Sequence, residues 1–370
     1  MELTAKQTCT YCILDTSEVT ITFDEKGVCR YCNDYFEISK NRAENPIMYS
    51  DSELQKHIEQ IKREGKNKEY DCIIGLSGGV DSSYVAYLSK QYGLRPLAVH
   101  LDNGWNAELA VKNIENICNK LDIDLYTHVI NWEEFKDLQL SFLKASVANA
   151  EAPTDHAIFA ILYIMARKYG IKWIIDGVNH ATEYVRNGGE AGGHAYSDLK
   201  QIKGIHKKFG KVPLKTYPSM SYYQKLYYKH FIGVKQFSIL NYVDYNKENA
   251  LKLLYEQLEW RSYGAKHHES LFTKWHQVVN LPQKIGYDKR KLHLSDLILS
   301  GQMSREEALE EIAKPPISQN EQMELEQYVQ KKLGLTEEEY KKMLKDTPKS
   351  YKEYPNDEWI INAYAKYKNR

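Results

Sequence analysis

The sequence lacks any long hydrophobic run. Among its 370 residues no apolar stretch approaches the roughly 18 residues that a membrane-spanning helix needs, and the polar N-terminus has no signal-peptide core. We therefore expect a soluble, cytoplasmic protein. The chain also lacks excess charge, because 50 Lys and Arg residues balance 50 Asp and Glu residues. The total charge therefore gives no indication of a polyanionic partner such as nucleic acid or an acidic membrane surface.

Cysteine is scarce too, and six residues in so long a chain are too few for a disulfide scaffold. Four of them form two pairs, 9-CTYC-12 and 29-CRYC-32, with sixteen residues between the pairs. This spacing is typical of a zinc site in which two Cys-x-x-Cys turns close a tetrahedron. Four thiolates leave no open position for catalysis, so we expect structural Zn²⁺ on Cys9, Cys12, Cys29 and Cys32. A redox or iron–sulfur centre is the alternative.

Short apolar runs alternate with amphipathic patterns through the middle of the chain, without an internal repeat. The runs cover 70–76, 96–102, 125–130, 172–178 and 235–243. Helical patterns cover 81–92, 107–121, 133–147, 155–169 and 222–231. Continuous apolar strands separated by helices predict an α/β fold with a parallel sheet that is covered on both faces.

Local signals outside this region predict further elements. Between the cysteine pairs, residues 19–29 indicate a short strand with a turn over 24–27. A capping box at Ser50 and Glu53 begins a helix that runs to about Gly65, and another helix is expected over 247–259. The rest of the chain is strongly helical, with a break over 314–318 and capping boxes at Ser304/Glu307 and Thr336/Glu339.

The stretch 75-GLSGGVDSSYVAYL-88 joins the first apolar run to a helix and contains no lysine. Its glycines allow a ligand close to the backbone, and the N–H groups and the positive helix end favour an anion. It lacks the lysine of G-x-x-x-x-G-K-S/T, which addresses β/γ-phosphates, and the G-x-G-x-x-G of dinucleotide folds. We therefore expect a phosphate cradle unsuited to γ-phosphate transfer. A glycine-rich turn without a ligand is the alternative.

The SGGVDSS string after a parallel strand resembles the PP-loop of the N-type ATP pyrophosphatases. The resemblance implies an adenine nucleotide alpha-hydrolase-like domain that binds ATP, with a substrate oxygen attacking the α-phosphate and pyrophosphate leaving. A cradle for leaving pyrophosphate would need no lysine for the γ-phosphate. The resemblance assigns this cradle to Ser77, Gly78, Gly79, Val80, Asp81 and Ser82, with Asp81 a candidate Mg²⁺ contact.

Two further segments fall at carboxyl ends of predicted strands, where ligands bind in such sheets. PP-loop proteins bind the adenosine at the position of 100-HLDNGW-105, so the resemblance implies that Asp102 and its neighbours lie near the base or ribose of ATP. The segment 176-DGVNHATE-183 resembles the Gly-x-Asn…(Asp/Glu) segment of PP-loop enzymes, which implies that Asn179 and Glu183 face the reaction. Each segment alone could be a simple strand-end turn, but the two occur in the expected order.

Over nearly its whole length the chain resembles the N-acetyl sugar amidotransferases of surface-polysaccharide, such as lipopolysaccharide O-antigen, and nonulosonic-acid biosynthesis. The matching segments are the Cys pairs, SGGVDSS, HLDNGW, 153-PTDHAI-158, GVNHATE, 260-WRSYGAKHHESLFTKWHQ-277 and 289-KRKLHLSDLILSGQMSREEAL-309. The stretch 186-RNGGEAGGHAY-196 departs from the family, where a tryptophan is expected, and this leaves the substrate open. The resemblance implies that ATP adenylates the oxygen of an acetamido group and that ammonia replaces it, giving an acetamidino sugar, AMP and pyrophosphate.

These segments divide the chain into a zinc-binding four-cysteine module (1–44), a PP-loop ATP pyrophosphatase domain (45–258) and a helical C-terminal substrate or partner region (259–370). Positive groups near the phosphates would stabilise the charge that develops during adenylation. Lys266 and His267 are our candidate catalytic residues. They belong to a basic cluster that also includes His268, Lys274, Lys289, Arg290 and Lys291. A solvated helical face is the alternative for this cluster.

No cysteine remains for glutamine hydrolysis, which requires an activated thiol. Cys72 falls in a predicted strand and Cys118 in an apolar helical pattern. We therefore expect separate glutaminase and ammonia-channel subunits, resembling those of imidazole glycerol phosphate synthase. A PP-loop tRNA thiolase is the enzymatic alternative, although such enzymes use further cysteines and grip a polyanion. A non-catalytic nucleotide-binding adaptor is the second alternative.

Overall fold

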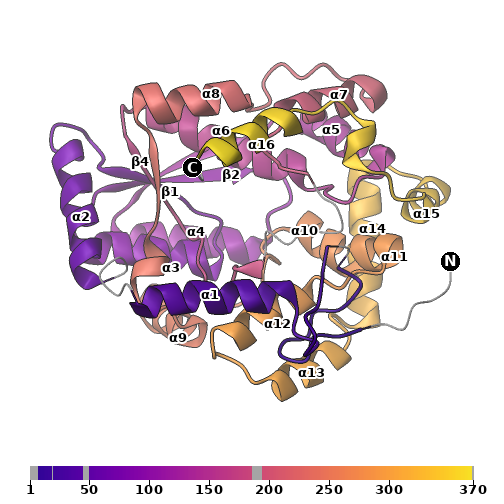
Figure 1. The fold of residues 1–370 in the computed structure, drawn as a ribbon. Coiled ribbons are helices and arrows are strands. Elements are labelled where there is room, and N and C mark those ends of the chain that lie inside the picture. The colour runs from indigo at the N-terminus through magenta and orange to yellow at the C-terminus, as the bar shows by residue number, and fades with distance from the viewer. Residues whose placement is uncertain (1–6, 19, 45–49, 186–193, 369–370) are drawn as a thin grey trace.

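The computed structural model describes residues 7–18, 20–44, 50–185 and 194–368 and confirms the predicted α/β class (Figure 1). Five parallel strands form one sheet in the order β3-β2-β1-β4-β5. The strands are β1 (Cys72–Gly75), β2 (Pro96–Asp102), β3 (Asp124–Val129), β4 (Trp173–Asp176) and β5 (Lys235–Ser238). The loop after β1 therefore lies at the centre of the sheet, between β2 and β4.

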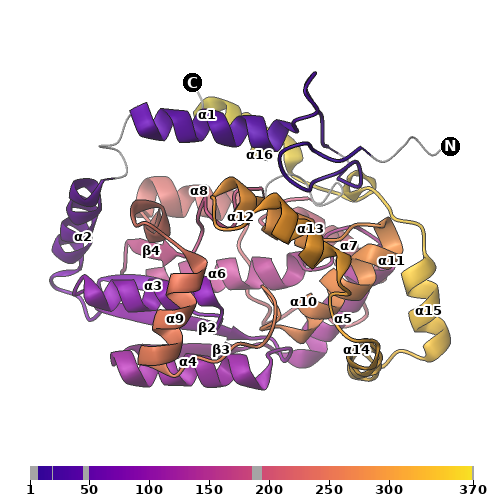
Figure 2. The same cartoon turned by 90° about the horizontal axis from the view of Figure 1, so that it is seen from below.

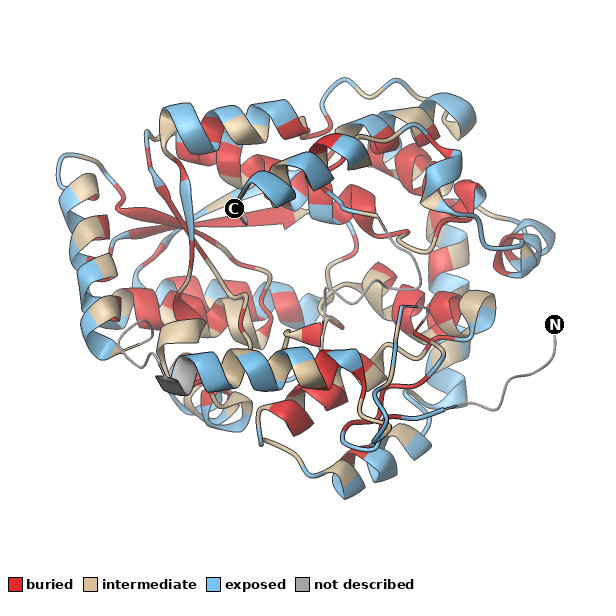
Figure 3. Ribbon diagram, in the orientation of Figure 1, coloured by how far each residue is buried: buried red, intermediate tan, exposed pale blue. Residues whose placement is uncertain are grey.

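Helices cover both faces of the sheet. Successive side chains of a strand point to opposite faces, so Ile74 packs against one helical layer and Ile73 against the other. The first layer contains α2 (Asp51–Gly65), α3 (Val80–Gln91), α4 (Glu108–Leu121) and α9 (Lys247–Leu258). The second contains α6 (Ala152–Lys168) and the π-helical turn Tyr228–Ile232, which continues α8 (Tyr222–Tyr227). Figure 3 shows the central strands almost entirely buried, which explains why they form continuous apolar runs in the sequence.

The C-terminal region is helical, as predicted. It contains α10 (Leu271–Trp275), α11 (Leu281–Ile285), α12 (Arg290–Leu299), α13 (Arg305–Ala313), α14 (Gln319–Leu333), α15 (Glu337–Lys345) and α16 (Glu358–Lys368). Both predicted capping boxes form, at Ser304/Glu307 and Thr336/Glu339, and the chain leaves helical conformation between α13 and α14. At Ser50 only half of the box forms, because the Ser50 side chain accepts from the Glu53 N–H. None of the described helices is both long and apolar enough to cross a membrane.

The C-terminal helices pack in two directions. Helices α10, α14 and α15 share a core with α5 (Trp132–Ala145) and α7 (Leu199–Phe209). Helices α11 to α13 share a different core with the four N-terminal cysteines. Figure 2 shows the N-terminal segment beside α12 and α13, on the side away from the sheet. The N-terminal cysteine segment therefore packs against helices of the C-terminal region.

Two local expectations were wrong, and a helix next to one of them was not predicted. The described part of 19–29 forms no strand but a single isolated bridge, Phe23 with Cys29. The Cys29 N–H donates to the sulfur of Cys9 over 3.2 Å and not to a partner strand. The turn over 24–27 does form, and Cys32 falls in the first turn of an unpredicted helix, α1 (Arg30–Glu44). The strand expected over 235–243 ends at Ser238, and the chain continues as a 3₁₀ turn, Ile239–Tyr242, whose first two apolar side chains remain buried.

Candidate active site

The loop between β1 and α3 has the backbone geometry of an anion cradle. Gly78 has φ of +82°, and a Cβ on it would lie 2.5 Å from the carbonyl oxygen of Ala110, so the position requires glycine. Gly79 caps α3 without a side-chain hydrogen bond. The N-terminal N–H groups of this helix, together with its dipole, are suited to a phosphate group.

The serine hydroxyls of the loop lie inside this turn. The Oγ atoms of Ser77 and Ser82 are 3.2 Å apart, and the Gly79 N–H donates to Ser77 Oγ over 3.2 Å. Ser77 Oγ in turn donates to Glu269 Oε1 over 3.4 Å. The loop therefore contacts the C-terminal region directly, across 192 residues of sequence.

Two adjoining cavities open at the carboxyl edge of the sheet, with volumes of about 430 and 400 Å³. They share the side chains of Ser77, His267 and Glu269. The first is lined mainly by the loop, α9 and the segment 260–269. The second lies over the ends of β1, β2 and β4 and is lined by polar side chains that include His100, Asn103, Asn106, Thr154, Gln277 and Lys289. Together they offer space for a nucleotide and a second substrate.

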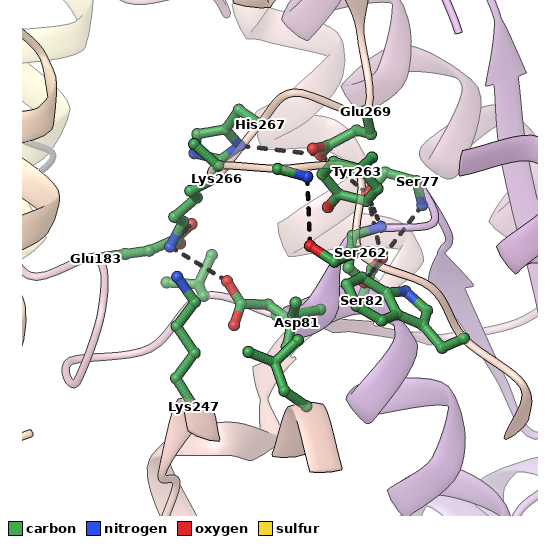
Figure 4. Close-up of a pocket in the computed structure, with 18 of the residues that line it drawn as sticks. Ser77, Asp81, Ser82, Glu183, Lys247, Ser262, Tyr263, Lys266, His267 and Glu269 are labelled. Atoms are coloured by element: carbon green, nitrogen blue, oxygen red, sulfur yellow. Dashed lines mark hydrogen bonds and ion pairs between the residues drawn. The ribbon is translucent and has the colours of Figure 1, made fainter. Parts of the chain in front are cut away.

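Lys266 bridges two carboxylates on the wall of the first cavity (Figure 4). Its Nζ lies 3.2 Å from Asp81 Oδ2, at the start of α3, and 3.1 Å from Glu183 Oε1, in the loop after β4. Burial disfavours the charged ammonium, but the two carboxylates outweigh this and raise the pKa of Lys266. Burial likewise opposes the charge on Asp81, yet Lys266 holds the pKa of that carboxyl below its ordinary value. Lys266 and Asp81 therefore stabilise each other's charged forms, and the Glu183 carboxylate lies beside the same ammonium.

Two residues missed by the sequence reasoning complete this network. The Tyr245 hydroxyl donates a hydrogen bond to Asp81. Lys247, at the start of α9, points toward Asp81 in Figure 4 and lines the same cavity. Burial and the neighbouring Lys266 both lower the pKa of Lys247. The sequence around Tyr245 and Lys247 indicated only that Asn246 caps a helix. That signal predicts where the helix begins but gives no functional role to its neighbours.

The segment that carries Lys266 also brings His267 and Glu269 to the shared wall of the cavities. His267 has φ of +64°, a left-handed conformation that is unfavourable for a non-glycine residue and is often found at functional positions. Its Nδ1 lies 3.9 Å from Glu269 Oε1. Burial opposes the charge on Glu269, but His267 keeps the pKa of that carboxyl low. Glu269 was not predicted and places a negative charge beside the phosphate cradle.

The predicted residues do not all reach the cavities. Ser77, Gly79, Val80, Asp81, Ser82, Glu183, Lys266 and His267 line the first cavity. Gly78 turns away, and its carbonyl accepts from Trp260 Nε1 over 2.9 Å. Asn179 is buried in its own turn, where Oδ1 accepts from the Thr182 N–H over 2.8 Å and so shapes the loop that presents Glu183. Asp102 accepts from the Gly104 N–H over 2.9 Å, while its neighbours Asn103 and Asn106 line the second cavity.

Much of the predicted basic cluster is used elsewhere. Lys274 pairs with Glu321 on α14. Arg290 pairs with Asp288 at 2.8 Å and donates to carbonyls at the end of α13. Lys291 pairs with Asp15 in the N-terminal segment. Of this cluster, Lys266, His267 and Lys289 line the cavities, so the alternative of a solvated face does not hold for those three.

The four paired cysteines converge on one point. Their Sγ atoms all lie within 4.8 Å of one another and are buried. Cys9 and Cys32 are 3.8 Å apart, Cys12 and Cys29 are 3.8 Å apart, and Cys29 and Cys32 are 3.5 Å apart. Around one ion with metal–sulfur bonds of about 2.3 Å, a tetrahedron places its sulfurs about 3.8 Å apart. These residues therefore fit a metal, although none of the four lines the cavities.

Two protein families match different parts of the chain. Residues 52–215 match the family described as NAD synthase, and residues 269–368 match the C-terminal domain of the family described as LPS biosynthesis protein WbpG-like. These matches confirm the sequence resemblance at the level of its two domains. A PP-loop ATP pyrophosphatase domain is followed by a WbpG-like domain, a combination that supports an ATP-using role of the amidotransferase type.

Individual relatives are more distant. An uncharacterized protein of Methanocaldococcus jannaschii, MJ1599, is 23% identical over 319 residues, which cover 84% of this chain and 94% of that protein. The tRNA-specific 2-thiouridylase MnmA 2 of Fusobacterium nucleatum is 30% identical over 121 residues, covering 30% of this chain and 34% of that enzyme. The solved U34-tRNA thiolase NcsA of Methanococcus maripaludis, with its 4Fe–4S cluster, has a TM-score of 0.33 at 15% identity, covering 81% of this chain and 90% of that one.

Proposed function

We propose that this chain, which joins a PP-loop domain to a WbpG-like domain, is an AMP-forming amidotransferase. Its substrate would be an N-acetyl sugar, carried on a nucleotide and used for surface polysaccharide or nonulosonic acid. The observation that supports this most directly is the shared pocket: the cradle of the first domain and Glu269 of the second line the same cavity. ATP and an acceptor held on either side of His267 and Glu269, which line both cavities, would meet there.

The residues of the first cavity suit the phosphates of ATP. The loop from Ser77 to Ser82 would hold the pyrophosphate end. Asp81 and Glu183 offer hard oxygen ligands that fit Mg²⁺, which when bound would shield the phosphate charges. Lys266 lies between these carboxylates and would stabilise the negative charge that develops at the α-phosphate.

In the proposed reaction an unreactive amide is activated in two steps. The acetamido oxygen attacks the α-phosphorus, so an O–P bond forms, the bond to the β-phosphate oxygen breaks, and pyrophosphate leaves with its electron pair. The amide nitrogen loses its proton, which gives an O-adenylyl imidate. Ammonia then attacks the imidate carbon, the C–O bond breaks, AMP leaves and an acetamidino group remains. His267 lies beside both cavities and is suited to taking the proton that the attacking ammonia must lose.

The ammonia is proposed to come from a separate glutaminase, delivered through an ammonia-channel partner. All six cysteines are buried. Burial raises the pKa of Cys118 to about 11 and raises that of Cys72 as well, which keeps both thiols protonated. Neither thiol is suited to attack glutamine or to transfer sulfur. Because a thiolase needs a cysteine that transfers sulfur, these two thiols argue against that alternative.

The metal at the four cysteines is proposed to be zinc, with a structural role. Sulfur separations near those of a single tetrahedral ion favour one metal over an iron–sulfur cluster, in which several irons stand between the thiolates. Iron and labile sulfide in the purified protein would contradict this assignment and would revive the thiolase alternative.

The reaction can be tested with purified protein, ATP, Mg²⁺, ammonium and a panel of nucleotide-linked N-acetyl sugars. We expect AMP and pyrophosphate, together with one sugar whose mass falls by the difference between O and NH. ADP as the product would contradict cleavage at the α-phosphate. AMP formation without a mass change in any sugar would contradict the acetamido acceptor, and ATP binding without turnover would favour the adaptor alternative.

A further inference from the structure

Residues of α12 and α13 make hydrogen bonds and an ion pair to the four-cysteine segment. Arg305 donates from Nε to the carbonyl of Cys12 and from Nη2 to the carbonyl of Cys9, both over 3.2 Å. The Ile13 N–H donates to Ser295 Oγ over 3.4 Å, and Lys291 pairs with Asp15. Because these groups belong to the first Cys-x-x-Cys turn or follow it directly, their positions depend on the closure of the metal site.

Helix α12, which carries Ser295, also contacts an active-site loop through the next residue, Asp296. Asp296, next to Ser295 and 1% exposed, accepts from the Val185 N–H over 2.8 Å. Val185 lies two residues after Glu183, the carboxylate that pairs with Lys266. The intervening Tyr184 packs its ring edge-on against Tyr35 of α1, with ring centroids 5.0 Å apart. The loop that presents Glu183 is therefore held from the N-terminal side of the molecule.

The turn after α12 holds a second active-site loop. Gln302 Oε1 accepts from the Lys247 N–H over 2.8 Å, and Gln302 Nε2 donates to the Tyr245 carbonyl over 3.2 Å. Tyr245 is the residue whose hydroxyl donates to Asp81, and Lys247 lines the first cavity. One amide side chain thus fixes both residues that approach Asp81 from this loop.

We infer that the metal-loaded cysteine module sets the geometry of the active site through α12 and its following turn, with Asp296 and Gln302 as positioning residues. Neither side chain lines either cavity. They act on Glu183, Tyr245 and Lys247, much as outer-shell partners orient the ligands of a metal. The inference goes beyond the proposed reaction, because it concerns how the pocket is built, whichever sugar enters it.

Hydrogen exchange of the full chain tests this without any substrate. The Val185 and Lys247 amides donate to Asp296 and Gln302, so we expect both to lose protection when the metal is removed and to regain it when Zn²⁺ is restored. Peptides from β2 serve as the internal control and should not change. Loss of protection confined to residues 7–44 and 290–313 would overturn the inference, because the module would then be only a local staple.

Variants of Asp296 provide the matched pair. Asp296→Asn keeps an oxygen that can accept from the Val185 N–H, whereas Asp296→Ala removes it. We expect both variants to bind metal fully, but only the alanine variant to lose protection at Val185. Its kcat for ATP cleavage should fall roughly tenfold to a hundredfold with a smaller change in KM. Equal behaviour of the two variants in exchange would overturn the role of Asp296, and failure to find any sugar would leave this exchange result intact.

Discussion

The Lys266 ammonium lies between two carboxylates that would repel each other without it. Its side chain is 11% exposed, and those of Asp81 and Glu183 are 19% and 16% exposed. Charges this far out of water are stable only as a set, because each relies on the others to offset its lost hydration. Removing the cation leaves two partly buried carboxylates beside the loop that we propose holds the phosphates of ATP. The cost should therefore be measurable in both stability and catalysis.

We predict that Lys266→Met lowers the free energy of unfolding by about 3–5 kcal/mol, the usual cost of breaking a buried ion pair from one side. It should also lower kcat/KM for AMP formation by roughly 10² to 10³, typical of losing one group that stabilises developing charge. Urea unfolding and pyrophosphate release measure the two effects. Lys314→Met is the control, because its pair with Glu311 is 64% and 50% exposed and should matter little. Wild-type pyrophosphate release by Lys266→Met would exclude its proposed role.

The motif residues were the easier part of the site to predict. Asp81 and Glu183 are found from strings that stand in order along the chain, and both line the first cavity. Asn179 was predicted from the same string, but its side chain is used within the turn. Glu269 and Lys247 were missed because they are distant in the sequence from the loop between Ser77 and Ser82. No local sequence pattern indicates that they line the same cavity as that loop.

The strand-to-helix turn around Gly78 should be far less tolerant of a side chain than an ordinary helix end. Gly78 and Gly170 both have positive φ, but a Cβ at Gly170 would meet nothing within 4 Å. We predict that Gly170→Ala costs only the conformational term of about 1–2 kcal/mol and keeps ATP affinity. Gly78→Ala should cost more and should weaken ATP binding, because the new Cβ forces the loop away from Ala110. Calorimetric titration with ATP and urea unfolding of both variants test this, and equal losses would contradict the cradle.

Strands that form continuous apolar runs were predicted well, whereas the turn that makes a hydrogen bond to a distant loop was not. The runs that became β1, β2 and β4 are buried on both faces, so their composition alone reveals them. The run after Ser238 is also apolar, yet it continues as a 3₁₀ turn, in which Asn241 accepts from the His180 N–H over 2.9 Å, a contact that no local pattern reveals. Helix α7 follows a stretch rich in glycine and was not predicted, although Ile202, Ile205 and Phe209 recur at helical spacing along it.

The N-terminal cysteine module and the C-terminal helices, although far apart in the sequence, pack against each other. The predicted boundaries treat the N-terminal module and the C-terminal region as separate parts, but Cys9 and Leu292 lie in one apolar core. A further core joins α10 and α14 to α5 of the PP-loop domain. The cavities form where the PP-loop domain meets the segment 260–289, so an acceptor bound there would contact residues from both parts. No remaining thiol in this arrangement is exposed to attack glutamine.

The purified chain should therefore use ammonium but not glutamine. We predict amidine formation that rises with ammonium concentration and with pH, because ammonia and not the ammonium ion is the nucleophile. Glutamine alone should give no product, and adding an unrelated glutaminase should restore turnover by releasing free ammonia. The double variant Cys72→Ser and Cys118→Ser controls for a hidden thiol and should keep ammonium-dependent activity if it folds, which circular dichroism can verify. Glutamine-dependent turnover by the wild-type chain without a partner would contradict the proposed supply of ammonia.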